Sequence, residues 1–197
     1  YKKAEKTLKK EISKTSNNVD LKLQLAAFYN DREQQIKSKK IYESLIENQN
    51  GSPSQCISLF NSFLLMSMPD LALEVLTNAK KKFKSYPFNF QEADLYAQKQ
   101  EKEKMIESYL SLLDKHDYYH EAVQKALLRR LALESEESKE FQLLKVALFE
   151  RAKKESSGVI FSEMLIWLYS QVDNFEGVFN QVVAVDNESD ILTYTLN

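Results

Sequence analysis

Residues 52–79 read SPSQCISLFNSFLLMSMPDLALEVLTNA, and this stretch decides the fold class. It opens with a helix start signal, because Ser52 can cap a helix, Pro53 suits the first helical position and Gln55 can complete a capping box. Pro69 then interrupts the pattern, as expected of a turn between two helices. Apolar residues on both sides of this turn recur at helical spacing; they are Leu59, Phe63, Ala72, Leu76 and Ala79. The stretch therefore predicts a pair of antiparallel helices.

The same pattern recurs along the chain with a period of about 34 residues, which is the signature of a repeat protein. Several series of mostly apolar positions keep this step. Three of these series are Leu25, Leu59, Ala93 and Leu127; Tyr29, Phe63, Ala97 and Leu131; and Ala4, Ser38, Ala72 and Ile106. A single helix pair cannot bury its apolar stripe alone, so neighbouring pairs must stack. The sequence thus predicts an all-α fold, an α-solenoid of antiparallel helix pairs.

The repeat divides the whole chain into units of one array. We expect a half repeat over 1–18, repeats over about 19–52, 53–86, 87–120, 121–158 and 159–190, and the start of a further helix over 191–197. The motif passes from Glu140 to Val178 with a longer spacing than elsewhere, which predicts an insertion of about four residues in the unit that begins near 121. Because both ends cut through a repeat, we expect the chain to be a fragment of a longer protein.

Composition narrows the possible functions. The 197 residues hold 27 Lys and Arg against 29 Asp and Glu, a net charge of −2, so no general attraction to nucleic acid is expected. Only 3 Gly and 3 Pro occur, too few for an all-β fold or a glycine-rich phosphate loop. No apolar run is long enough for a transmembrane helix. Since catalytic and nucleotide-binding motifs are absent as well, we expect neither a cofactor nor enzymatic activity.

Two features invite interpretation as chemical sites. His116 and His120 are four positions apart and can share a helix face, with Glu121 next to them as a third metal ligand. The intervening residues do not form a His-Glu-x-x-His motif, so exposed or capping histidines are the simpler interpretation, and no metal is expected. An enzyme that uses both histidines stays open as an alternative. Cys56, the single cysteine, is expected to be a buried structural residue.

The repeated helix–turn–helix pattern resembles the tetratricopeptide repeat (TPR) family, and residues 53–86 fit it best. The chain departs from the family pattern at several positions: Phe60, Asp94, Ile106, Leu128 and Glu140. Its C-terminal half looks closest to bacterial cell-envelope members, through residues 106–113 and 165–169. The resemblance implies a right-handed superhelix, a protein-binding scaffold, and a periplasmic or cell-envelope location with any signal peptide missing from this fragment.

In a stacked TPR array the first helix of each pair lines a concave groove, so the resemblance places a partner there. The residues expected to line it are Leu23, Asn30, Ile57, Asn61, Leu64, Gln91, Leu95, Gln98, Lys125 and Arg129. The amides among them can bond to the backbone of an extended peptide. Arg129 can hold a carboxylate through two hydrogen bonds, and Lys125, one turn away, adds charge. The expected partner is a protein or peptide.

The uneven distribution of charge along the chain supports a second interpretation of its function. Residues 1–14 contain six lysines against Glu5 and Glu11, whereas residues 155–197 contain seven acidic residues and no Lys or Arg. Ordinary solvated helix faces explain such a pattern. The basic end of one molecule could also dock on the acidic end of another, which predicts a structural self-assembly module whose association weakens with added salt.

Overall fold

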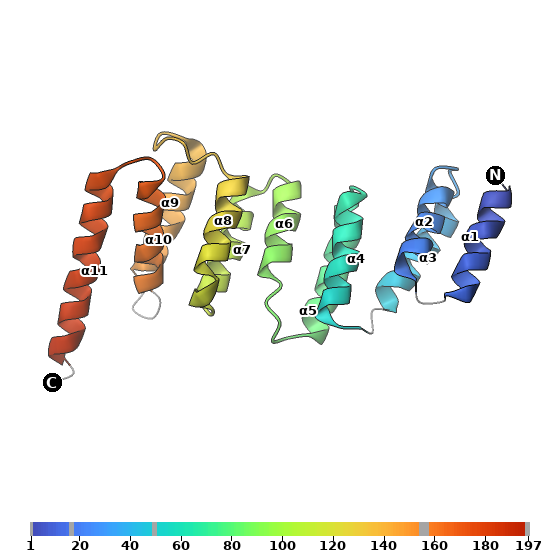
Figure 1. The fold of residues 1–197 in the computed structure, drawn as a ribbon, viewed down its shortest axis with the longest axis horizontal. Coiled ribbons are helices and arrows are strands. Elements are labelled where there is room, and N and C mark those ends of the chain that lie inside the picture. The colour runs from blue at the N-terminus through green and yellow to red at the C-terminus, as the bar shows by residue number, and fades with distance from the viewer. Residues whose placement is uncertain (1, 16–17, 49–50, 154–157, 196–197) are drawn as a thin grey trace. The chain divides into compact units, whose positions relative to one another are not determined.

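The computed structural model describes residues 2–15, 18–48, 51–153 and 158–195, with side chains described as far as residue 185. In this part of the chain the backbone forms eleven α-helices and one short 3₁₀-helix, and no strand (Figure 1). The all-α class predicted from the sequence is therefore confirmed.

The chain divides into two compact units, Tyr1–Gln91 and Glu92–Asn197. The first unit contains α1 (Lys2–Lys14), α2 (Val19–Asn30), α3 (Gln35–Glu47), α4 (Pro53–Leu65) and α5 (Pro69–Lys82). Helix α6 (Asn89–Gln98) begins at the end of the first unit and lies mostly in the second. The second unit continues with α7 (Lys102–Leu113), η1 (Asp117–Tyr119), α8 (His120–Arg130), α9 (Lys139–Ala152), α10 (Gly158–Ser170) and α11 (Phe175–Thr195).

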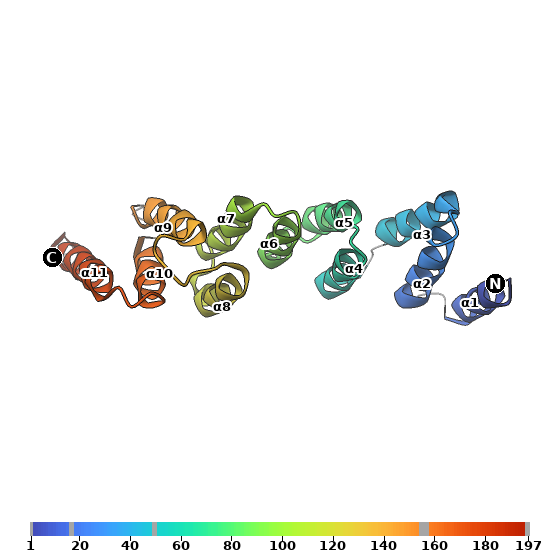
Figure 2. The same ribbon diagram turned by 90° about the horizontal axis from the view of Figure 1, so that it is seen from above.

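Within each unit, helices that are neighbours in sequence pack against each other. In the first unit α2 packs on α3, α4 packs on α5, and α1 contacts α2. In the second unit α10 packs on both α9 and α11, and α7 contacts α8 and α9. Figure 2 shows α7 and α9 on one side of this unit, with α8 and α10 on the other. Helices α2 to α10 thereby bury apolar residues against their neighbours, as the periodicity requires, whereas α1 has no buried residue.

Helix α4 begins as its sequence predicts. The Gln55 side chain accepts a hydrogen bond from the Ser52 amide at 3.1 Å, and together with the Ser52 side chain this forms a capping box ahead of Pro53. The box satisfies amide groups that a helix N-terminus otherwise leaves without partners. The start of the first helix in this repeat is therefore fixed by local chemistry.

Four connections between paired helices share one backbone conformation. Their turn residues all have positive φ: Glu33 (57°), Ser67 (56°), Gln100 (60°) and Asp173 (53°). In each turn the next amide donates to the carbonyl five positions before it; the pairs are Gln34 to Tyr29, Met68 to Phe63, Glu101 to Tyr96 and Asn174 to Tyr169. A left-handed residue followed by such a bond is the Schellman ending of a helix. This ending stops each first helix and lets the second begin at once.

The turns also correct the predicted register. The accepting carbonyls of Tyr29 and Phe63 keep the predicted step, but the next one belongs to Tyr96, one position earlier than that step requires. Tyr96, rather than the predicted Ala97, therefore continues this series. By the same one-residue shift, Met105, which is 1% exposed, takes the place expected for Ile106. The assumption of a constant step was wrong here because the third turn arrives one residue early.

Two further predictions about the second unit were wrong. Leu131 was expected inside a first helix, but α8 ends at Arg130 and Leu131 is extended (φ −121°, ψ 143°) at the start of the longer connection 131–138. A new helix was expected over 191–197, but α11 continues without a break to Thr195, and residues 196–197 lie outside the described part. Residues 186–195 contain neither Gly nor Pro, so nothing local ends the helix there.

The turn conformation makes a testable prediction about stability. We expect Ser67→Gly to raise the free energy of unfolding by about 0.5–1 kcal/mol, because glycine adopts positive φ without the steric cost that serine carries. The matched control is Ser58→Gly in the middle of α4, where glycine should instead lower stability by about 0.5 kcal/mol. Urea unfolding measures both values, and a loss of stability in both variants would contradict the assignment of the turn.

Candidate partner-binding surface

The predicted groove residues have unequal access to solvent. Asn30, Asn61, Gln98, Lys125 and Arg129 are exposed, and Ile57, Leu64 and Gln91 are half-buried. Leu23 and Leu95 are buried, at 7% and 2% exposure, so their assignment to an open groove was wrong. Leu23 shares a face of α2 with the fully buried Ala26, and Leu95 was misplaced by the one-residue shift in register.

With the register corrected by one residue, the position equivalent to Asn61 is Asp94, not Leu95. Asp94 accepts a hydrogen bond from Arg130 Nη2 at 2.5 Å, which joins α6 to α8. Burial raises the pKa of the Asp94 carboxyl from its ordinary value, and the guanidinium groups of Arg130 and Arg129 offset part of that rise. Sequence reasoning missed this pair. The aromatic series Tyr29, Phe63 and Tyr96 signals the shifted register, but only the packing of α6 and α8 shows the contact with Arg130.

Beside this pair, the second unit has an open pocket of about 770 Å³. It is lined by the α6–α7 turn, the end of α8 and the first turns of α9. Its charged lining residues are Lys102, Lys104, Arg129, Arg130 and Lys139, with Glu101, Glu103 and Glu140. Five cations against three carboxylates give the lining an excess of positive charge, which favours an anionic ligand.

Some of these charges are already paired. Lys102 pairs with Glu140, Lys104 pairs with Glu101, and Arg130 pairs with Asp94. The excess of positive charge in the lining therefore rests on Arg129 and Lys139, balanced in part by Glu103. Arg129 donates through Nε to the carbonyl of Lys125 at 3.0 Å. Within the residues that the structure describes, neither Arg129 nor Lys139 forms an ion pair with a carboxylate. The terminal nitrogens of Arg129, whose charge also acts on the Asp94 carboxyl, are therefore candidate donors at the pocket.

The two cations predicted on α8 are placed differently. Arg129 lines the pocket together with Arg130 and Lys139. Lys125 is exposed one turn earlier and pairs with Glu121 at 3.5 Å along the same helix. Such an exposed pair at i, i+4 is weak and can open when a stronger anion approaches. The arrangement suits a carboxylate held by Arg129, with Lys125 beside it.

The histidines and the cysteine occupy other places. His116 packs edge-on against Tyr118 and Tyr119, with ring centroids 5.7 Å and 6.2 Å away. His120 Nδ1 lies 3.2 Å from the carbonyl oxygen of Asp117, at the start of α8. Among the described residues, no group of three or more His, Cys, Asp or Glu side chains is arranged to hold a metal ion. Cys56 is buried, and that burial raises the pKa of its thiol.

Comparison with known proteins gives no identity: no family model, no curated protein and no solved structure matches this chain. In the described residues, no helix is both long and apolar enough to cross a membrane.

Proposed function

We propose that the chain is a non-catalytic scaffold of TPR type, which binds an extended peptide or a partner protein along the first helices of its pairs. The observation that carries this proposal is Arg129, an exposed arginine at the rim of a 770 Å³ pocket with an excess of positive charge. A guanidinium in this position can hold a carboxylate through two parallel hydrogen bonds.

The repeated turn supports the TPR part of the proposal. Four helix endings with the same left-handed residue and the same hydrogen bond would give each pair a similar geometry. Stacked pairs of similar geometry form a superhelix, and the right-handed TPR superhelix is the form that we propose. A bacterial cell-envelope location remains a prediction of the family resemblance.

The ligand that this surface fits best is a peptide with an acidic side chain or a terminal carboxylate. The carboxylate would lie against Arg129, with Lys139 and Lys125 adding positive charge. Separately, the exposed amides of Asn30 and Asn61 in the first unit have donors and acceptors that match those of a peptide backbone. Backbone bonds supply affinity that depends little on sequence, whereas the arginine selects the acidic group.

The test is a reversal of charge at the two cations on α8. A crosslinked pull-down with the wild-type chain identifies the partner, and the captured segment is then made as a labelled peptide. Fluorescence anisotropy measures its affinity for the wild type and for a Lys125→Glu, Arg129→Glu variant. We expect the variant to bind at least about tenfold more weakly, because a charge-assisted pair becomes a repulsion.

The matched control is Lys6→Glu, Lys10→Glu, which changes the net charge equally on the exposed side of α1. Equal losses in both variants would show a general charge effect and would contradict the proposed site. The Arg129→Lys variant is a second check, because it keeps the positive charge but cannot form two parallel hydrogen bonds. We expect it to bind the peptide more weakly than the wild type does. A peptide that binds all four proteins equally would overturn the proposal.

A further inference from the structure

Helix α11 presents an apolar stripe to solvent. Phe175 is 75% exposed, Phe179 66%, Val182 39% and Val183 41%. These residues lie at i, i+4, i+7 and i+8, so they share one face of the helix. The half-buried residues Gly177, Val178, Gln181 and Val185 lie on the adjoining face, where α11 packs on α10. Four large apolar side chains in one stripe are more than the scattered exposure usual for a surface helix.

Comparison with α7 shows that most positions of this stripe match buried positions of another helix. The turn residues Gln100 and Asp173 have the same conformation and each precedes a second helix, so matching the two turns aligns α11 with α7. The aligned pairs are Ile106 with Phe179, Tyr109 with Val182, and Leu110 with Val183. On α7 these positions are at most 1% exposed, and α7 contacts α8 and α9. Phe179, Val182 and Val183 therefore occupy positions that are core in α7, where other helices pack, whereas Phe175 aligns with the exposed Lys102.

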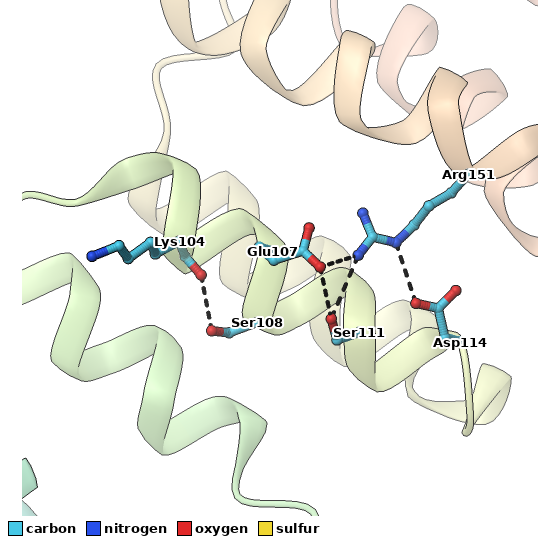
Figure 3. Close-up of polar contacts among 6 residues, drawn as sticks. All are labelled: Lys104, Glu107, Ser108, Ser111, Asp114 and Arg151. Atoms are coloured by element: carbon cyan, nitrogen blue, oxygen red, sulfur yellow. Dashed lines mark hydrogen bonds and ion pairs between the residues drawn. The ribbon is translucent and has the colours of Figure 1, made fainter.

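Helix α9, which packs on α7, also places a positive charge against it (Figure 3). Arg151, from α9, has a side chain only 9% exposed and reaches two carboxylates of α7 and its C-cap. Its Nη2 lies 2.5 Å from Glu107 Oε1, and its Nε lies 3.3 Å from Asp114 Oδ2. Helix α9 thus gives α7 both apolar contacts and a cation that pairs with the acidic residues of α7 and its C-cap.

The acidic composition of the C-terminal segment favours a basic partner for α11. Residues 155–197 contain seven acidic residues and no Lys or Arg. Three of the acidic residues, Glu163, Asp173 and Glu176, lie exposed on α10, in the turn and on α11. Two copies paired through α11 would bring carboxylates against carboxylates, which opposes that arrangement. A second copy could still offer its lysine-rich α1, and sedimentation distinguishes that occupant from another protein. Charge complementarity instead favours a covering helix that carries positive charge.

We propose that the outer face of α11 docks an amphipathic helix of another protein, with an apolar stripe flanked by lysine or arginine. The helix covers Phe175, Phe179, Val182 and Val183, while its cations lie near Glu176 and its acidic neighbours. This is recognition of a helix by its apolar stripe and flanking charge. The face is separate from the pocket at Arg129, so either proposal can fail while the other stands.

The test uses two labelled model helices, each about 18 residues long so that it can be helical. One has leucines flanked by lysines, and the other has the same pattern with glutamates in place of lysines. Anisotropy measures their binding to the wild-type chain and to Phe179→Ser, Val183→Ser, which keeps the charge unchanged. The control variant is Val146→Ser, Phe149→Ser, a similarly exposed apolar pair on α9.

We expect the leucine–lysine helix to bind the wild type at least about tenfold more tightly than the leucine–glutamate helix. The α11 variant should lose at least about tenfold in affinity, and the α9 control should stay within about twofold. The Lys125→Glu, Arg129→Glu variant should bind this helix as the wild type does, which separates the two proposals.

Three results would overturn the proposal: equal binding of both model helices, equal losses in the α11 and α9 variants, or self-association of the wild type that the α11 variant abolishes in sedimentation experiments. The last result would show that a second copy of the chain covers this face.

Discussion

Phe63→Ala is expected to lower the free energy of unfolding by about 3–5 kcal/mol, the usual cost of removing a fully buried phenylalanine. Phe63 is 0% exposed and meets the Tyr42 ring edge-on, with centroids 5.5 Å apart. The Phe63 carbonyl accepts a hydrogen bond from the Met68 amide in the turn that ends α4. The substitution thus leaves a cavity where α3, α4 and the α4–α5 turn come together.

Urea unfolding followed by far-ultraviolet circular dichroism measures this loss. Leu65→Ala is the matched control, because Leu65 lies two positions away on the same helix and is 88% exposed. Its replacement should change stability by no more than about 0.5 kcal/mol. Similar losses in the two variants would mean that the faces of α4 are assigned wrongly.

The difference between Phe63 and Leu65 was predictable from the sequence. Phe63 belongs to one of the repeating series of apolar positions, and Leu65 does not. Helical periodicity records which face a residue occupies, and neighbouring pairs must bury that face. The capping box at Ser52 is likewise local, so four adjacent residues were enough to predict it.

The third turn was not predictable in the same way. A left-handed residue ends the helix at Gln100, but glutamine has no special preference for positive φ. Nothing in its identity reveals that the turn comes one residue early. Because of this one-residue shift in register, Leu95 lies in the core and Asp94 contacts Arg130. Part of the candidate site was therefore missed for a reason that lies in the backbone conformation.

Contacts between distant residues were also beyond the sequence. Arg151 lies 44 residues after Glu107 and 37 after Asp114, so their meeting depends on how α9 sits against α7. A charged residue in a helix normally predicts a solvated face. Only packing shows that this arginine is buried while its neighbour Lys153 is exposed. The exposed amides and Arg129 were easier to predict, because periodicity places them outside the packed stripe.

Arg151→Ala should lower the free energy of unfolding by about 2–3 kcal/mol. The substitution removes two charge-assisted contacts and the cation–π contact with Phe161, whose ring centroid lies 5.7 Å from Arg151 Cζ. It also leaves a void along the buried part of the side chain. The loss should stay below that of a fully buried ion pair, because Glu107 is 60% exposed and can be hydrated when its partner is gone.

Arg151→Met separates these contributions. Methionine refills most of the volume without the charge, so if packing dominates, the loss falls to about 1 kcal/mol. Lys153→Ala is the control on the same helix, since its exposed pair with Glu150 should contribute no more than about 0.5 kcal/mol. Urea unfolding of all three variants gives the comparison. If Arg151→Met lowers stability as much as Arg151→Ala, the charge of Arg151 and not its volume stabilises this contact. The two carboxylates on α7 and its C-cap then require a cation. We infer the same requirement for the helix that docks on α11.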